Sequence, residues 1–308
     1  MSSGVSKFDR SWQLLKGSFQ VIGGNRKLLL FPVVSFAFTL MIVLFFLAPV
    51  VLAPTGHSLA DPAHWRAVVD RIGVVDAGGR RQQMVFHDTT YAYIAVIYLV
   101  SMVCATFFNV AFYSEILKAL RGESVSVRSG LAFACSRIRP ILLWSLFAGL
   151  VGLVIKGLEQ RFGWVGRLVL RFIGMVWSVA SVFAIPVIVC EEESNPVVLL
   201  RHSAETLRKT WGESLIGYVG ITFASWIVLL VSLVLLIGGV IVSILIGHPM
   251  LILLFVLAWI VSLFAFGYIM AVANHIYRCA LYVYASSGAV PQPFTTELMD
   301  GAWKVKKA

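Results

Sequence analysis

The chain has 308 residues, of which 59% are hydrophobic and 13% charged, with a formal net charge of +10. Soluble domains carry about 25% charged residues, so this composition excludes an ordinary soluble globular protein. Several apolar runs reach the ~20 residues that cross a bilayer, and the sequence therefore predicts an all-α integral membrane protein. We expect no nucleic-acid partner, because the chain has neither a soluble basic domain nor an aromatic-basic platform.

Six membrane-spanning helices are predicted within a single membrane domain, residues 1–308. The first apolar run is too long for a signal peptide and is interpreted as a retained span. A long apolar block near the C-terminus is divided at Gly247-His248-Pro249 into the last two spans, and the tandem Gly238-Gly239 leaves a seven-span alternative open. The six predicted spans are residues 28–54, 91–117, 141–155, 164–189, 214–245 and 250–276.

The distribution of basic residues predicts the orientation. With six spans, seventeen Lys and Arg residues fall on the side of the two termini, seven fall on the other side, and Arg171 lies within a span. By the positive-inside rule, both termini are cytoplasmic. Residues 1–27 then hold a cytoplasmic interfacial helix, residues 55–90 form an exported loop, and residues 285–308 form a cytoplasmic tail. The predicted location is a plasma membrane of the bacterial inner-membrane type, with a multi-pass topology.

Three cytoplasmic segments, each preceding an odd-numbered span, carry an apolar stripe at helical spacing with basic residues beside it. Such helices lie in the membrane interface, with the apolar face toward lipid. We expect three interfacial amphipathic helices and, on one reading, a threefold parallel pseudo-repeat. The alternative reading is that any protein built of membrane hairpins needs basic amphipathic starts. The stripes consist of Phe8, Trp12, Leu15 and Phe19; of Val127, Leu131, Ala134 and Ile138; and of Val197, Leu200, Ala204, Leu207 and Trp211.

Four stretches of sequence carry a family resemblance: RSWQLLKGSFQVI, KLLLFPVVS, TLRKTWGESLIG and IYRCALYVYASSGAVPQPF. Together they resemble an uncharacterised family of bacterial multi-span membrane proteins. More distantly, the chain is similar to the membrane domain attached to some glycerophosphodiester phosphodiesterases. The resemblance implies no catalytic residue and no cofactor, because the family has no assigned activity.

Arg167 and Arg171 lie one helical turn apart in the fourth predicted span. At 1.5 Å per residue, Arg171 lies about 10 Å from Trp164 at the outer interface, within the reach of a snorkelling arginine. The pair is interpreted first as a snorkelling anchor. The alternatives are an anion or lipid-headgroup site, and an ion pair with Glu159 or Asp88.

Asn274, His275 and Arg278 form a polar cluster at the cytoplasmic end of the sixth span. We interpret it as a set of interhelical bonds, with a headgroup or ligand contact as the alternative.

The exported loop carries His57, Asp61 and His64 at a spacing that suggests a metal site. However, Asp61 followed by Pro62 is a better start for a short amphipathic helix, with Asp61 as its N-cap. We therefore expect a helical lid and no metal.

The sequence predicts a non-enzymatic membrane protein, a membrane scaffold or a lipid-associated partner protein. No nucleophile elbow, P-loop or HExxH motif is present. No carboxylate lies mid-span, which disfavours proton or sodium coupling. The alternatives are a passive or weakly coupled transporter or channel for a small or anionic solute and, third, an enzyme acting on lipid headgroups. The expected partners are membrane lipids and a protein at the cytoplasmic face; the sequence predicts no cofactor and leaves the oligomeric state open.

Overall fold

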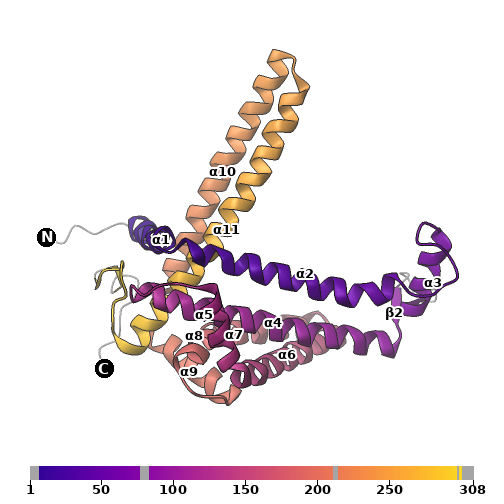
Figure 1. Ribbon diagram of the computed structural model, residues 1–308, viewed down its shortest axis with the longest axis horizontal. Coiled ribbons are helices and arrows are strands. Elements are labelled where there is room, and N and C mark those ends of the chain that lie inside the picture. The colour runs from indigo at the N-terminus through magenta and orange to yellow at the C-terminus, as the bar shows by residue number, and fades with distance from the viewer. Residues whose placement is uncertain (1–6, 77–82, 211–213, 297, 300–308) are drawn as a thin grey trace.

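The computed structural model describes the backbone of residues 7–76, 83–210, 214–296 and 298–299, and side chains within these ranges except at 7–11, 74–76, 83–85, 160, 209–210, 214–227 and 249. This part of the chain is almost entirely helical (Figure 1). Six of its helical stretches are long and apolar enough to cross a membrane, as predicted. They are Arg26–Val51, Asp88–Leu120, Ile138–Glu159, Trp164–Cys190, Val228–Ile246 and Met250–Ser287.

The first four spans are built from six helical elements. The short 3-10 helix η1 leads directly into α2, while the third span is longer than predicted because its helix continues through a polar end. The fourth span is interrupted: α7 ends at Ala180 and α8 begins at Ala184. The elements are η1 (Arg26–Leu29), α2 (Leu30–Val51), α4 (Asp88–Leu120), α6 (Ile138–Arg161), α7 (Trp164–Ala180) and α8 (Ala184–Cys190).

The last two spans form a long hairpin of α10 (Ser214–Ile246) and α11 (Pro249–Ser287). The seven-span alternative is wrong, because α10 continues without a break through Gly238-Gly239. The turn falls at Gly247, whose φ of +75° suits glycine, and Pro249 occupies the first turn of α11. α11 extends beyond the predicted residue 276 to Ser287, because its last third is packed within the protein.

The loop of residues 55–90 adds one short strand pair to an otherwise helical chain. Asp61 caps α3 (Pro62–Ile72) by accepting a hydrogen bond from the Ala63 N–H at 2.8 Å, so the short helix is confirmed. It is followed by an antiparallel hairpin of β1 (Gly73–Asp76) and β2 (Gln83–Phe86). Two short β-branched and apolar runs around Gly78-Gly79 were the sequence signal for this hairpin.

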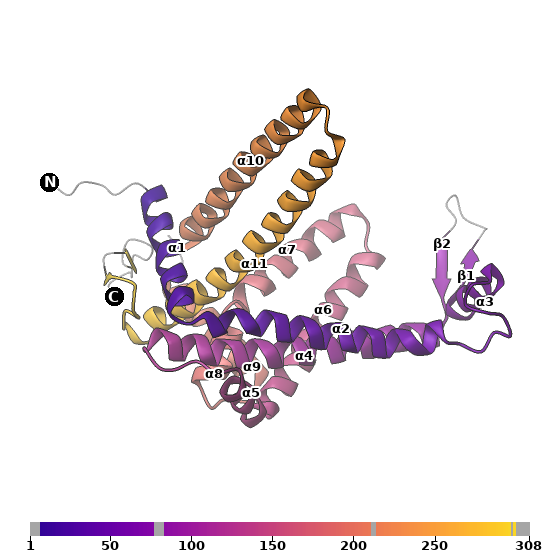
Figure 2. The ribbon, with the colours of Figure 1, turned by 45° about the horizontal axis from the view of Figure 1, so that its top comes forward.

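The hydrophobic core lies at the end of the molecule that carries the two termini. It combines the last third of α4, the start of α6, α8 and the last third of α11; Val110, Ile116, Ile141, Val187 and Ile276 are each 0% exposed. The C-terminal segment joins this end, where the Phe294 ring packs against Gly17. Away from the core the spans diverge, and the α10–α11 hairpin leaves α2 and α4 at a wide angle (Figures 1 and 2).

The three predicted amphipathic helices form as α1 (Lys7–Gly24), α5 (Val127–Ser136) and α9 (Pro196–Thr210). Their buried faces include the stripe residues Leu15 and Ala134 but extend beyond the stripes. α1 buries Leu14 and Ser18 against the bundle, while Trp12 is 52% exposed. α9 buries Leu199 and Ser203, and its stripe is exposed or half-buried. Trp211 lies outside the described residues; the interfacial placement and the pseudo-repeat stay predictions.

Candidate functional site

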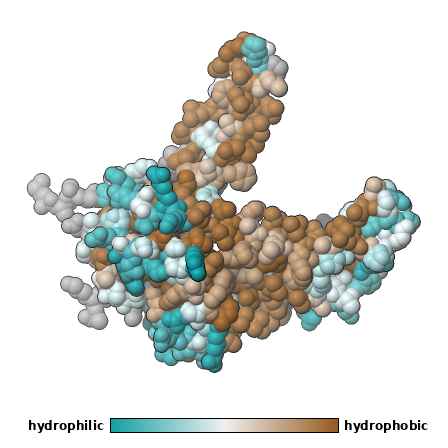
Figure 3. All heavy atoms as spheres, in the orientation of Figure 1, coloured by the Kyte–Doolittle hydropathy of each residue, from teal (hydrophilic) through white to brown (hydrophobic). Residues whose placement is uncertain are grey.

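The polar chemistry of the molecule gathers at the packed end. Figure 3 shows hydrophilic residues there and around α3, with hydrophobic residues covering the α10–α11 hairpin and the region between the two ends. A helix that faces hydrocarbon needs apolar side chains outward, so this surface fits a bilayer. The packed end and the cavities between the spans are therefore the places where a site can be sought.

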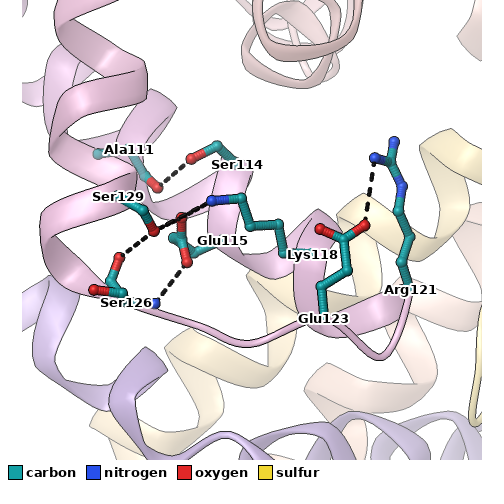
Figure 4. A network of polar contacts seen from close by, with 8 residues as sticks. All are labelled: Ala111, Ser114, Glu115, Lys118, Arg121, Glu123, Ser126 and Ser129. Atoms are coloured by element: carbon teal, nitrogen blue, oxygen red, sulfur yellow. Dashed lines mark hydrogen bonds and ion pairs between the residues drawn. The ribbon is translucent and has the colours of Figure 1, made fainter.

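A buried carboxylate joins α4 to α5. The Glu115 side chain is 0% exposed, and its Oε1 accepts hydrogen bonds from Lys118 Nζ and Ser129 Oγ, both at 2.7 Å. Its Oε2 accepts the Ser126 N–H at 2.7 Å, at the N-cap of α5 (Figure 4). Each carboxylate oxygen is thus engaged by the chain's own donors, which favours a structural role.

A serine on α9 forms hydrogen bonds with the backbone at the interruption of the fourth span. Ser203 on α9 is 0% exposed; its Oγ accepts the Phe183 N–H at 3.0 Å and donates to the Ala180 carbonyl at 2.6 Å. These two backbone groups flank the break between α7 and α8. Broken helices are tolerated in membrane proteins where the freed backbone groups find protein partners. Pro186, which cannot donate to the carbonyl four residues earlier, was the sequence signal for this break.

A second carboxylate links three elements just past the end of α8. Glu191 Oε2 lies 2.5 Å from His202 Nδ1 on α9, and Tyr282 on α11 donates to Glu191 Oε1 at 3.2 Å. Two residues on, the backbone N–H groups of Ser194 and Asn195 donate to the Glu193 carboxylate and lower its pKa. These contacts fix the start of α9 relative to α11.

The predicted cluster of Asn274, His275 and Arg278 lies in the last third of α11, which is packed in the core. Two of its members lie beside one residue of α4. His275 Nδ1 lies 2.9 Å from the Tyr113 hydroxyl, and Arg278 lies beside the same phenol. Asn274 is half-buried on the same helix, and the described residues provide no hydrogen-bond partner for its side chain. An interhelical role is therefore observed for His275 and Arg278.

His275 also lines a cavity of about 300 Å³ between α2, α4 and α11. Its polar lining comes from Ser35 and Thr39 on α2, Asn109 on α4 and His275, and Phe31 and Phe112 stack beside it with centroids 5.4 Å apart. Asn109 was missed in the sequence, although a lone asparagine within a long apolar run was a usable signal.

A larger cavity of about 620 Å³ lies at the other end of the molecule, between the end of α2 and the start of α4, against α3. Its lining is mainly apolar, with Phe46, Leu47 and Ile97 among the residues, and Arg71 is its one charged member within the described part of the chain. Sequence reasoning missed this role of Arg71, because the contact between α3 and the spans is not encoded locally.

The predicted pair Arg167 and Arg171 is exposed on α7 and lies in neither of these cavities. No ion pair with Glu159 or Asp88 forms among the described residues. Exposed arginines on an otherwise apolar helix agree with snorkelling, and the anion site stays a prediction.

The loop residues His57, Asp61 and His64 do not converge on one point. His57 Nδ1 pairs with Asp61 at 3.4 Å. His64 is 2% exposed; its Nδ1 lies 2.6 Å from Thr55 Oγ1 and its Nε2 lies 2.9 Å from the Val51 carbonyl. Both ring nitrogens of His64 are thus engaged in hydrogen bonds within the protein. In the described ranges, no group of three His, Cys, Asp or Glu side chains is placed to hold a metal.

The helices and their apolar surface define a multi-pass membrane protein. The chain belongs to a family of unknown function, DUF6159, whose model matches residues 89–291, from the start of α4 to just beyond α11. Comparison with curated proteins and with solved structures gives no match. The matched region contains the Glu115 network, Ser203 and the inner part of α11, so these features belong to the part of the chain shared with the family.

Proposed function

We propose that this protein is a non-enzymatic, lipid-associated membrane scaffold whose packed end faces the cytoplasm. The observation that carries the proposal is the division of the molecule into a packed end and diverging spans. The core and the Glu115, Ser203 and Glu191 contacts lie at the end with the termini, while the α10–α11 hairpin separates from α2 and α4. Helices that diverge in a bilayer leave space that lipid fills, so lipid contacts become part of the assembly.

The polar contacts favour a scaffold over an enzyme. The Glu115 carboxylate is fully engaged by hydrogen bonds within the chain, and Glu191 is held by His202 and Tyr282. A general acid or base must reach a substrate proton, and these carboxylates are already bound to neighbouring side chains and backbone. They fix helices to one another and so give the cytoplasmic end a defined surface for a partner protein.

The orientation rests on the excess of Lys and Arg on the side of both termini. On this basis we assign the protein to a bacterial inner membrane, in keeping with the resemblance to bacterial multi-span proteins and, distantly, to phosphodiesterase membrane domains.

Purification in a mild detergent, followed by mass spectrometry of the retained proteins and lipids, tests the proposal. We expect reproducible retention of phospholipid and of at least one protein partner that binds through the packed end. Variants of the exposed residues Arg121 and Glu123, in the loop after α4, should reduce protein capture without reducing lipid retention. A preparation free of lipid and partner, yet folded, would contradict the proposal.

A passive transporter or channel is the second candidate, favoured by the polar cavity at Asn109 and His275 and by the interrupted fourth span. Against it, Phe31 and Phe112 line that cavity and also belong to the core of the packed end. Flux of small solutes into proteoliposomes, compared between the native chain and Asn109→Leu, decides between the candidates, since only a transporter should show a difference.

A further inference from the structure

The cavity against α3 is lined mainly by apolar side chains and by one cation, Arg71. It lies where α2 ends and α4 begins, at the end of the molecule opposite the termini (Figure 1). Its volume of about 620 Å³ falls within the range of small-molecule sites. The helices that form its walls are apolar and face the bilayer, so a lipid chain enters without leaving a hydrocarbon environment.

Arg71 is held at the mouth of this cavity. Its Nη2 donates to the Pro54 carbonyl at 2.8 Å, which fixes the guanidinium between α3 and the end of α2. Arg71 takes no part in the ion pairs found among the described residues. Asp70 beside it on α3 and Asp88 at the start of α4 are both exposed and do not line the cavity, Asp61 pairs with His57, and the side chain of Asp76 lies outside the described ones. Among the described side chains, nothing neutralises this positive charge, so it is available to a ligand.

Most of the other polar groups of the lining form hydrogen bonds within the protein. Thr90 Oγ1 donates to the Ile72 carbonyl at 2.8 Å, and the Tyr93 hydroxyl donates to the Phe46 carbonyl. Thr89, in the first turn of α4, adds a hydroxyl to the lining. A ligand of this cavity thus meets an apolar wall, one guanidinium and one threonine.

An arginine at the membrane interface binds phosphate through paired N–H groups, and an apolar slot beside it accepts an acyl chain. We propose that this cavity binds one anionic glycerophospholipid of the surrounding leaflet, with its phosphate at Arg71 and one acyl chain between α2 and α4. The inference rests on the proposed lipid-associated function and names the lipid class and the site. With the termini in the cytoplasm, the lipid belongs to the outer leaflet.

The test uses the full chain in nanodiscs of equal phosphatidylcholine and phosphatidylglycerol, with native mass spectrometry of the lipids that stay bound after release. The native protein should retain phosphatidylglycerol in preference to phosphatidylcholine. Arg71→Gln should lower that preference about fivefold, since an interfacial cation contributes about this factor. Arg71→Lys, which keeps the charge, should retain most of it. Arg66→Gln is the matched control, because Arg66 is exposed on the same helix and does not line the cavity.

A second pair of variants tests the slot separately from the charge. Ile97→Trp and Leu47→Trp each place an indole in the lining and should reduce retention of both lipids; Leu47 is 47% exposed, so its variant folds readily. Size-exclusion profiles and thermal unfolding are compared for every variant. Equal losses in Arg71→Gln and Arg66→Gln, or full retention in both tryptophan variants, would overturn the site while leaving lipid association intact. A native protein that retains no lipid would overturn the proposed function as well.

Discussion

Ser203 and Phe183 join two helices across a break in a membrane span: the Phe183 N–H donates to Ser203 Oγ at 3.0 Å, and the same hydroxyl donates to the Ala180 carbonyl. One side chain thus satisfies two backbone groups at the interruption between α7 and α8. Because an unpaired buried backbone group is costly, α9 is fixed to the bundle by the same contact that makes the break tolerable. The packed end is held together by this contact and by similar contacts at Glu115 and Glu191.

Replacing Ser203 with alanine should destabilise the protein by about 2 kcal/mol or more, because it leaves a buried donor and a buried acceptor unpaired. The free energy of unfolding in mixed micelles of increasing SDS fraction measures this. Ser181→Ala is the control, since the Ser181 hydroxyl donates only to the Ser178 carbonyl one turn earlier and does not bridge to α9. Equal effects of the two variants would show that the Ser203 hydrogen bonds at the break do not stabilise the protein.

Replacing Glu115 with alanine should cost about 3 kcal/mol, because Lys118 loses its partner and the Ser126 N–H loses its acceptor at the start of α5. Glu123→Ala should change stability by less than about 0.5 kcal/mol, since its pair with Arg121 spans 4.0 Å and both side chains are exposed. The same unfolding assay compares them. A small effect at Glu115 would mean that the network is not needed for docking of α5 on α4.

Gly130→Ala should destabilise the contact of α5 with α4. A Cβ at Gly130 would lie 2.8 Å from the Ala111 carbonyl oxygen and 2.9 Å from the Phe31 ring, and the backbone atom has little freedom to move. We expect a loss of about 1–3 kcal/mol. At Gly157 on α6 no described atom lies within 4 Å of such a Cβ, so Gly157→Ala should be neutral or stabilising. Comparison of the two thermal midpoints gives the answer, and a tolerated Gly130→Ala would refute the close packing.

Two substitutions on α9 distinguish its buried face from its predicted stripe. Leu199→Ala should cost about 2–5 kcal/mol, because Leu199 is 0% exposed in the core. Val197→Ala should have little effect, since Val197 is 59% exposed. If Val197→Ala is the more damaging when both are measured in lipid vesicles, the apolar stripe contributes more through lipid contact than the buried face does through packing.

The spans could be predicted from the sequence because the length of an apolar run is a local property. Their ends could not: Lys156 and Glu159 are polar and still continue α6, and His275 and Arg278 lie well inside α11. The stripe of α9 was a correct sign of a helix, yet the residue that anchors it is Ser203. Its importance depends on a break twenty residues earlier in the chain, and only the assembled fold brings the two together.

The candidate site residues show the same limit. His275 and Arg278 stand out in the sequence as polar residues on a membrane helix, but their partner Tyr113 comes from another span. Arg71 looks like any basic loop residue until α3 is placed against α2 and α4. In contrast, Arg167 and Arg171 are conspicuous in the sequence and lie exposed on α7, where a snorkelling role needs no partner.

The central claim is that the packed end faces the cytoplasm and the end with α3 faces outward. Cysteine labelling of intact cells with a membrane-impermeant thiol reagent tests it, after replacement of Cys104, Cys135, Cys190 and Cys279. Ala60→Cys, in the exposed loop before α3, should be labelled in intact cells. Ser124→Cys, in the exposed loop between α4 and α5, should be labelled only after the membrane is permeabilised. Labelling of residue 124 and not residue 60 in intact cells would contradict the account.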